Sequence, residues 1–275
     1  MQDTLASSAS FAANRARGAV AFDVHLVEGR TRRRQLHESG SLRVRFPSPE
    51  DDGLTAMFVN TAGGAAGGDR FDIDITAGER TRLTMSTAAA EKVYRSHGPA
   101  AEINISLRAE AGAHLSWLPQ ETILFDQART TRCIDIDLAE TASLVLCEIV
   151  VFGRTAMGEA MRTGSFVDRW RLRRGGRLVF AENVRLDGDI GAKLAQPAIA
   201  NGGLAIATAL IVPGDEALLE RLRAVAEQAG CEVGISCWNG FAMVRICAQD
   251  AAKLRADMMA LLSQSGAMLP RMWLN

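Results

Sequence analysis

Apolar and polar residues alternate in several short stretches of this chain. These stretches are 42–46, 71–75, 103–107, 134–138 and 170–173. A period of two is typical of a strand with one buried and one solvated face. Turn-forming glycine, aspartate and proline residues separate the stretches, as they do in all-β proteins. The pattern therefore predicts a body of stacked or sandwiched β-sheets.

The pattern changes towards the C-terminus. Asp215 can cap a helix over residues 217–226, and Asn239-Gly240 is a strong signal for a hairpin turn. Asp250 can cap a second helix that has one apolar face. The sequence therefore predicts a mainly β fold that ends in a small helix-hairpin-helix portion.

The 275 residues of the chain suit one large domain or two small ones. We expect one domain over residues 19–275, in which 19–212 is the β body and 213–275 is the α+β portion. The residues before it, 1–18, lack the basic start and the apolar stretch of a secretory signal. They are expected to form a flexible tail.

The formal net charge of −1 argues against a nucleic-acid binder. The basic run at 30–34 is expected at a solvated strand end or at a partner contact. No apolar run approaches the roughly 18 residues that cross a membrane. The five cysteines include no Cys-x-x-Cys pair, so they are expected to be reduced and buried, as in a cytoplasmic protein.

Two glycine pairs, at 63–64 and 67–68, are followed by Asp69 and then by a predicted strand. A phosphate-binding loop would lead into a helix instead. Tight turns with close backbone packing are therefore favoured over nucleotide binding. Asp69 is either a turn-capping acid or a functional carboxylate, and the loop alone does not choose between them.

The sequence contains no motif for a tight metal site or an activated nucleophile. The four histidines are scattered, and there is no Gly-x-Ser-x-Gly segment. The turn that follows Glu148 contains Arg154 and Glu159. Either these two form an ion pair that fixes the turn while Glu148 needs a buried partner, or Glu148 and Glu159 line an interior polar path.

Five ordered segments make the chain resemble the UreD family of urease accessory proteins, which is also called UreH. The segments are 60–69, 92–96, 117–125, 152–159 and 270–273. The resemblance runs from about residue 20 to the C-terminus. Glu91 departs from the family pattern, which often has a small or hydroxyl residue there, and Met272 stands where another aliphatic residue is common.

The resemblance implies a superhelical, mainly β fold and a non-catalytic scaffold. Proteins of this family bind the urease apoprotein and a partner, UreF, which in turn engages the GTPase UreG. The assembly inserts nickel into the urease active site. No tightly bound cofactor is implied, but nickel would pass transiently through an internal tunnel. Dimerisation within the complex is left open.

A transit route must hold Ni²⁺ weakly, and carboxylates suit such a route better than nitrogen or sulfur ligands. Acids in or near the matched segments are the candidates: Asp69, Glu148, Glu159, Asp168 and Glu182. Arg95 and Arg154 are expected to be structural partners of some of these acids.

Two positions are open for Trp273: it either docks onto the helices of its own chain or helps to form the surface for UreF.

Two other classes of function compete with the scaffold. A small β-rich hydrolase would use Glu148 and Glu159 as an acid/base pair about 5–10 Å apart. A metal-storage protein would need clustered histidines or cysteines, which the sequence lacks.

Overall fold

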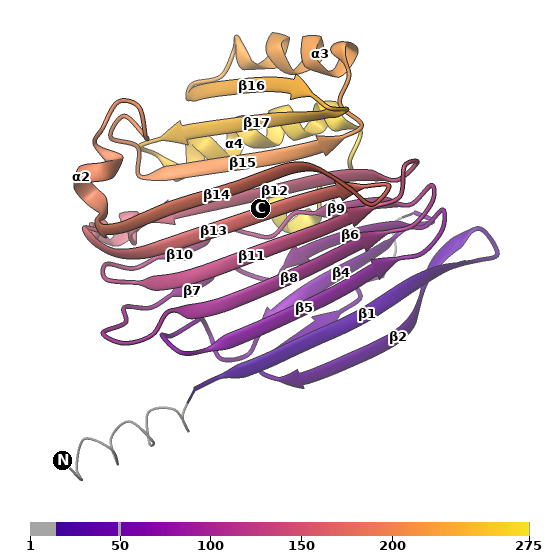
Figure 1. The fold of residues 1–275 in the computed structure, drawn as a ribbon, viewed down its shortest axis with the longest axis horizontal. Helices are drawn as coiled ribbons and strands as arrows, with labels where there is room; N and C mark the ends of the chain where they lie inside the picture. Colours follow the sequence, from indigo (N-terminus) through magenta and orange to yellow (C-terminus); the bar gives the residue numbers. More distant parts are fainter. Residues whose placement is uncertain (1–14, 49–50, 275) are drawn as a thin grey trace.

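The computed structural model describes residues 15–48 and 51–274, which form two stacked sheets, A with seven strands and B with ten (Figure 1). The strands of sheet A are β1 (Arg17–Val27), β2 (Arg30–Gly40), β5 (Arg70–Ala77), β8 (Ala101–Ala109), β11 (Arg129–Leu138), β13 (Thr163–Arg174) and β14 (Arg177–Asp189). Those of sheet B are β3 (Leu42–Arg45), β4 (Leu54–Asn60), β6 (Arg82–Thr87), β7 (Glu91–Val93), β9 (His114–Trp117), β10 (Thr122–Leu124), β12 (Ser143–Phe152), β15 (Ala205–Val212), β16 (Glu232–Trp238) and β17 (Phe241–Ala248).

The chain passes back and forth between the two sheets, as in a β-solenoid. In sheet A, β5, β8, β11 and β13 lie parallel, and in sheet B, β4, β6, β9 and β12 do the same. Parallel neighbours cannot be joined by a tight hairpin, so each connection crosses to the other sheet and returns. The predicted mainly β fold with stacked sheets is confirmed.

Antiparallel strands complete both sheets. Sheet A ends in the hairpins β1–β2 and β13–β14, and sheet B continues from β12 through β15 and β17 to β16. The β16–β17 hairpin turns at Asn239 and Gly240, as predicted, and both have positive φ, at 48° and 77°. The C-terminal portion therefore extends sheet B.

Two helices, α3 (Glu216–Ala226) and α4 (Ala251–Leu262), pack on the outer face of sheet B, whereas the short helix α2 (Ile190–Leu194) contacts β13 and β14 of sheet A. The 3₁₀ turns are η1 (Thr155–Met157), η2 (Ser263–Ser265) and η3 (Arg271–Trp273). The Asp215 carboxylate accepts a hydrogen bond from the Leu218 N–H at 2.7 Å, and the Asp250 carboxylate accepts one from the Ala252 N–H at 2.8 Å. Both predicted helix caps are confirmed. No helix in residues 15–48 and 51–274 is long and apolar enough to cross a membrane.

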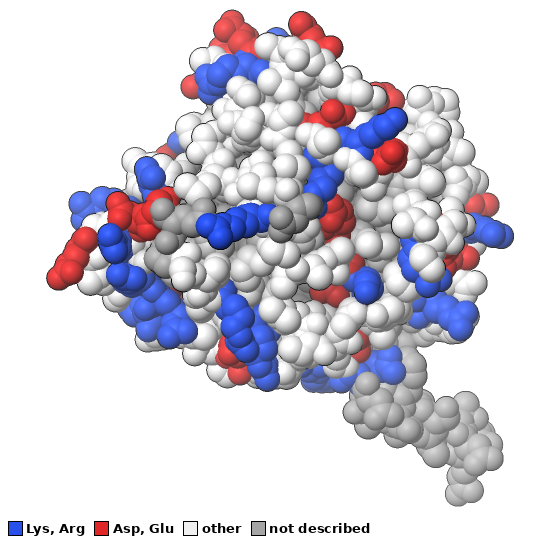
Figure 2. Space-filling view, turned by 180° about the vertical axis from the view of Figure 1, so that it is seen from behind, with Lys and Arg blue, Asp and Glu red and all other residues white. Residues whose placement is uncertain are grey.

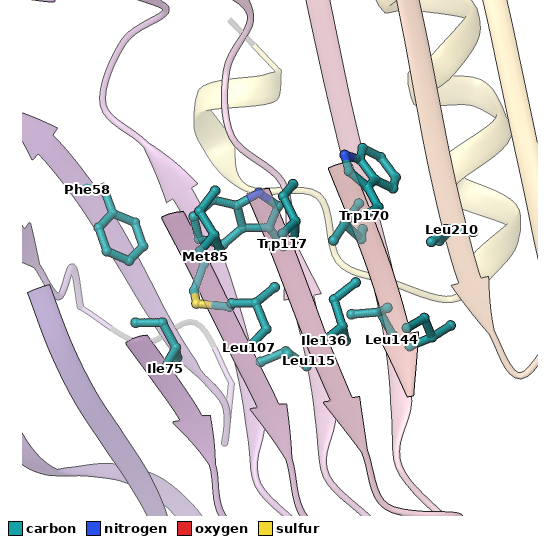
Figure 3. Packing of buried hydrophobic residues seen from close by; sticks show 14 of the residues in the cluster. Phe58, Ile75, Met85, Leu107, Leu115, Trp117, Ile136, Leu144, Trp170 and Leu210 are labelled. Carbon is teal, nitrogen blue, oxygen red and sulfur yellow. The ribbon is translucent and has the colours of Figure 1, made fainter. Parts of the chain in front are cut away.

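Two hydrophobic clusters hold these layers together. The larger lies between the two sheets, where Leu107, Leu115, Ile136 and Leu144 lie close together (Figure 3). The smaller packs the outer face of sheet B against α3 and α4. The inward rows of the strands therefore form the main core, and a polar residue in such a row needs a partner.

The basic run at 30–34 lies on β2, the edge strand of sheet A, where Arg32, Arg33 and Arg34 are exposed. Figure 2 shows Lys and Arg gathered on the side where the β1–β2 hairpin projects, while the centre of that face is largely uncharged. The run therefore lies on a solvent-exposed edge strand, which fits both of its expected roles, a solvated strand end and a partner contact. The predicted tail over residues 1–18 extends too far, because β1 already begins at Arg17; residues 1–14 lie outside the described residues.

Candidate functional site

Three charged side chains interrupt the apolar interior between the sheets. Arg132 lies on β11, Glu148 on β12 and Asp168 on β13, and each occupies an inward-facing position of its strand. Arg132 and Asp168 are direct partners in the parallel β11–β13 register. The three residues are only 4–6% exposed, so they form a buried ionic group, the Arg132 cluster.

Every charge of the Arg132 cluster is paired. The Arg132 guanidinium donates two parallel hydrogen bonds to Asp168, Nε to Oδ1 at 2.9 Å and Nη2 to Oδ2 at 2.6 Å. Its Nη1 donates to Glu148 Oε2 and, at 3.5 Å, to Thr122 Oγ1. Trp117 Nε1 donates to the second oxygen of Glu148 at 2.8 Å. The prediction that Glu148 needs a buried partner is confirmed.

Burial and the neighbouring charges shift the pKa values of Arg132 and Glu148 in opposite directions. Burial lowers the pKa of Arg132, but the charges of Asp168 and Glu148 outweigh it and raise that pKa. Burial raises the pKa of Glu148, and the Arg132 guanidinium opposes that shift by favouring the ionised carboxylate. Because a guanidinium stays protonated in proteins, the cluster is ionic and depends on all of its members.

Glu182 extends the cluster towards the surface. It lies on β14, and its carboxylate accepts a hydrogen bond from Arg245 Nη2 on β17 at 2.5 Å. Burial raises the pKa of Glu182, Arg245 opposes this shift, and Asp168 adds to it. Arg132, Glu148, Asp168 and Glu182 all line one small cavity of 20 Å³, the junction cavity. The structure thus brings together three of the five predicted acids.

A larger cavity of 230 Å³ adjoins the junction cavity and also has Arg132 and Glu148 on its wall. We call it the glycine-loop cavity, because Gly63 and Gly64 form part of its wall. Its rim includes exposed Gly63 and Lys92, whereas Trp117, Arg132 and Glu148 are buried. The two cavities share Arg132 and Glu148 as wall residues, and most of the other side chains on the wall of the larger cavity are apolar.

Glu91 lies on the wall of the glycine-loop cavity. Asn60 Nδ2 donates to both oxygens of its carboxylate, at 3.2 and 3.3 Å. Burial raises the pKa of Glu91 from 4.5 to about 7, and the Asn60 amide opposes this shift. The folded protein therefore binds a proton here at mildly acidic pH, where the unfolded chain does not.

Glu91→Gln should make the protein more stable at pH 8 and leave its stability at pH 4.5 nearly unchanged. The raised pKa means that wild-type stability is complete below pH 4.5 and falls as the pH rises towards 7. One pKa unit corresponds to about 1.4 kcal/mol, and partial exposure reduces the total effect to about 2 kcal/mol. Urea unfolding at both pH values measures the difference; equal stability of both proteins at pH 8 would contradict this expectation.

Asp69 has a structural role outside these two cavities. Its Oδ1 accepts a hydrogen bond from the Ala16 N–H at 2.8 Å, and its Oδ2 accepts one from the Ala66 N–H at 2.7 Å. Gly67 packs so closely that a Cβ there would lie 1.9 Å from Ser96 Oγ. Asp69 lines neither cavity. Of its two predicted roles, turn-capping acid or functional carboxylate, its contacts fit the first.

Glu159 also lies outside the two cavities, in a surface loop. It pairs with Arg154, Nε to Oε2 at 2.7 Å and Nη2 to Oε1 at 3.0 Å, which confirms the predicted ion pair. Glu148 and Glu159 share neither of the two cavities, so the hydrolase alternative lacks its geometric basis. Arg95 is exposed, and no salt bridge to it occurs within residues 15–48 and 51–274.

Trp273 is docked onto its own chain. It is 1% exposed, and its Nε1 donates to the Leu118 carbonyl at 2.8 Å. The Arg255 guanidinium lies over its ring, 5.1 Å from the centroid. Gln120 Nε2 donates to the Met272 carbonyl at 2.9 Å. Of the two alternatives for Trp273, the structure shows the docked one.

Arg132 is a residue of the site that was not predicted from the sequence. The signal is present, because Arg132 stands two residues before Ile134 and four before Ile136, in the inward row of an alternating strand. An arginine in that row predicts a buried acidic partner. Glu91 carries no comparable signal, since its strand has only three residues.

The carboxylates on the walls of the two cavities are not clustered. Within residues 15–48 and 51–274, no group of three or more His, Cys, Asp or Glu side chains is arranged to hold a metal ion. The carboxylates Glu91, Glu148 and Asp168 on the cavity walls are each already hydrogen-bonded.

Comparisons with known proteins agree on one family. The family model described as UreD urease accessory protein matches residues 15–274. A protein of Bradyrhizobium diazoefficiens named urease accessory protein UreD is 73% identical over 269 residues, which cover 98% of each chain. A protein of the same name from Rhodopseudomonas palustris (strain BisA53) is 72% identical over 272 residues, covering 99% of this chain and 95% of that one. With its solenoid-like β fold and its match along nearly the whole length, this chain belongs to the UreD family of urease accessory proteins.

Proposed function

We propose that this protein is a non-catalytic scaffold in urease maturation and that nickel passes towards the urease apoprotein along an interior route formed by the two cavities. Family membership supports the maturation role. The single observation that supports the route is the Arg132 cluster, since Arg132 and Glu148 line both cavities. Nickel is the cargo here and needs no resident site.

Carboxylates at spaced positions can move a cation by short steps. Glu148 and Asp168 share the Arg132 guanidinium, and Glu182 shares Arg245. An arriving divalent cation competes with these guanidinium groups for the same oxygens. Because the carboxylates already have partners, none of them gains the full free energy of an empty metal site, and the ion is not trapped.

Replacing Glu148 and Glu182 together by glutamine should lower nickel-dependent activation of urease by about tenfold or more, since a barrier higher by about 1.4 kcal/mol slows a step tenfold. Glutamine keeps the shape but removes the charge that draws the cation forward. Urease activity after co-expression with the accessory proteins measures the effect, and capture of UreF reports whether the fold is intact.

Glu159→Gln is the matched control, because Glu159 is a paired carboxylate on the surface and off the route. It should leave activation unchanged. Normal activation by the Glu148→Gln, Glu182→Gln protein, with UreF still captured, would refute the carboxylate route.

The partners are part of the proposal: UreF directly, the GTPase UreG through UreF, and the urease apoprotein. Membership of the UreD family supports them. Co-expression of the tagged chain with its cognate UreF and UreG, followed by size-exclusion chromatography, should yield a stable ternary complex and give its stoichiometry. A monomer that binds neither partner would contradict the scaffold role.

A further inference from the structure

Sheet B extends further than sheet A at the end of the molecule that holds β14 and β16. These two strands are the last ones of sheets A and B. β14 lies opposite β17, because Glu182 is hydrogen-bonded to Arg245. The ring centroids of Phe180 on β14 and Phe241 on β17 are also only 5.4 Å apart. β16 follows β17 and projects past β14 (Figure 1). Within residues 15–48 and 51–274, no strand of sheet A therefore covers β16.

The inner face of β16 is consequently open to solvent. Its outer row includes Val233 and Ile235, which are half-buried and pack on the smaller hydrophobic cluster. Its inner row is exposed at every position: Glu232, Gly234, Ser236 and Trp238. Trp238 is 40% exposed, although an indole is usually well buried. We call this inner row, together with the free edge of β14, the shelf.

The free edge of β14 carries main-chain groups that have no partner. The Ser165 N–H bonds towards β11, so the even-numbered residues of β13 face β14. In the β13–β14 register even-numbered residues lie opposite each other, as Asp168 does with Val184. The odd-numbered residues of β14 therefore direct their N–H and C=O groups away from β13. Within residues 15–48 and 51–274, no hydrogen bond reaches the main chain of Ala181, Asn183 or Arg185.

The open part of this edge is short, because side chains close both of its ends. Asn239 Nδ2 donates to the Val179 carbonyl at 3.4 Å, and Lys193 Nζ donates to the Asp187 carbonyl. Residues 181–185 remain open, over about 16 Å at about 3.3 Å per residue, which is an ordinary strand length. A strand paired with β14 there would lie about 10 Å above sheet B. Its side chains would then fill the space over the inner row of β16.

We propose that the shelf binds one extended segment of a partner protein, which joins sheet A as an additional strand beside β14. The inference rests on the proposed scaffold role, since the segment comes from a protein of the activation assembly. Main-chain hydrogen bonds to residues 181–185 provide the affinity, and alternate side chains of the segment pack on β16. The added strand covers the exposed inner row and satisfies the open edge together.

The residues of the shelf define the chemistry of the segment. Gly234 and Ser236 leave room in the middle, since a Cβ at Gly234 would meet no atom closer than the Arg245 carbonyl oxygen, at 4.0 Å. Trp238 offers an apolar surface at one end. Glu232, at the other end, has no salt bridge within residues 15–48 and 51–274. The segment therefore carries apolar side chains at alternate positions and a lysine or arginine opposite Glu232.

A second copy of this chain does not fit the shelf through its own β14. Two β14 strands paired edge to edge would be about 4.8 Å apart. Each sheet B extends at least one strand, also about 4.8 Å, beyond its own β14, so the two β16 strands would occupy the same space. The shelf admits a strand that has no second sheet beneath it. A flexible loop or terminus of a partner supplies such a strand.

Peptide binding tests the inference. Overlapping peptides of UreF, UreG and the urease subunits, each of about 12 residues and so longer than one strand, are probed with the full chain. At least one peptide with alternating apolar residues and a basic residue should bind. Gly234→Trp should fold normally, because the site is open, and should weaken that binding by about tenfold or more. Ser106→Trp is the matched control, since Ser106 is exposed on the outer face of sheet A, and it should bind like the wild type.

Hydrogen exchange in the assembled complexes locates the added strand. Amides of residues 181–185 should exchange about tenfold or more slowly in the complex with the protein that supplies the segment. Asn183→Pro removes one N–H that points away from β13, a change that an edge strand tolerates, and it should weaken the same peptide.

The inference is overturned if no peptide binds the wild type, or if Gly234→Trp binds the peptides as the wild type does. Protection of residues 181–185 that grows with the concentration of the chain alone would indicate a second copy and would also contradict it. A ternary complex that forms without protecting β14 refutes the shelf and leaves the scaffold role intact. If no ternary complex forms, the scaffold role fails, and the peptide measurements still decide the shelf.

Discussion

Arg132→Met should lower the free energy of unfolding by about 3–5 kcal/mol, the usual effect of removing one partner from a buried ion pair. Arg132 is 4% exposed and is the shared cation of Glu148 and Asp168. Methionine fills much of the space but leaves two carboxylates unpaired between the sheets. Burial leaves these carboxylates with little water, so the folded state bears most of the loss.

Urea unfolding of the purified protein, or of its UreF complex if the chain needs that partner, measures this effect. Arg154→Met is the control, because it breaks the Arg154–Glu159 pair at the surface, where a pair contributes about 0–1 kcal/mol. Adding Glu148→Gln and Asp168→Asn to Arg132→Met should recover much of the lost stability. An Arg132→Met protein as stable as Arg154→Met would show that the cluster is not a coupled ionic group.

Trp273→Ala should lower the free energy of unfolding by about 3–5 kcal/mol, as truncation of a buried aromatic residue does. The indole is 1% exposed, and its loss also leaves the Leu118 carbonyl without its donor. Leu118 itself is fully buried. The substitution therefore opens a cavity and breaks the link between the C-terminal segment and sheet B.

Urea unfolding and limited proteolysis together measure this effect, because the C-terminal segment can detach before the sheets unfold. Trp238→Ala is the control, since Trp238 is 40% exposed on the β16–β17 hairpin and should cost only about 1 kcal/mol. If Trp273→Ala matched Trp238→Ala in stability and in protease resistance, the docked segment would contribute little to the fold.

Local patterns in the sequence predicted most of the elements but not their arrangement. The helix caps at Asp215 and Asp250 and the turn at Asn239-Gly240 depend on neighbouring residues, so the sequence alone was enough. The order of strands in each sheet depends on partners far apart in the chain, such as β1 beside β5. The short helix α2 has five residues, too few for a helical period to be recognised.

The candidate site shows the same limit. The sequence indicated that Glu148 needs a buried partner, but Arg132 lies in the opposite sheet and its proximity follows only from the stacking. From the sequence, Glu159 and Glu182 were equal candidates for the nickel path. Glu182 follows Phe180 in an inward row and reaches the junction cavity, whereas Glu159 lies in a loop where no strand period applies.

The C-terminal contacts also affect the order in which the chain can fold during its synthesis. Coils of the solenoid join strands that are near neighbours in sequence, so they can stack as they leave the ribosome. The bonds from Trp273 to Leu118 and from Gln120 to Met272 span 155 and 152 residues, and Gln120 is part of the glycine-loop cavity. In a nascent chain, the Gln120 side chain therefore gains its bond to the Met272 carbonyl, and Trp273 its bond to Leu118, only after the coils have been synthesised.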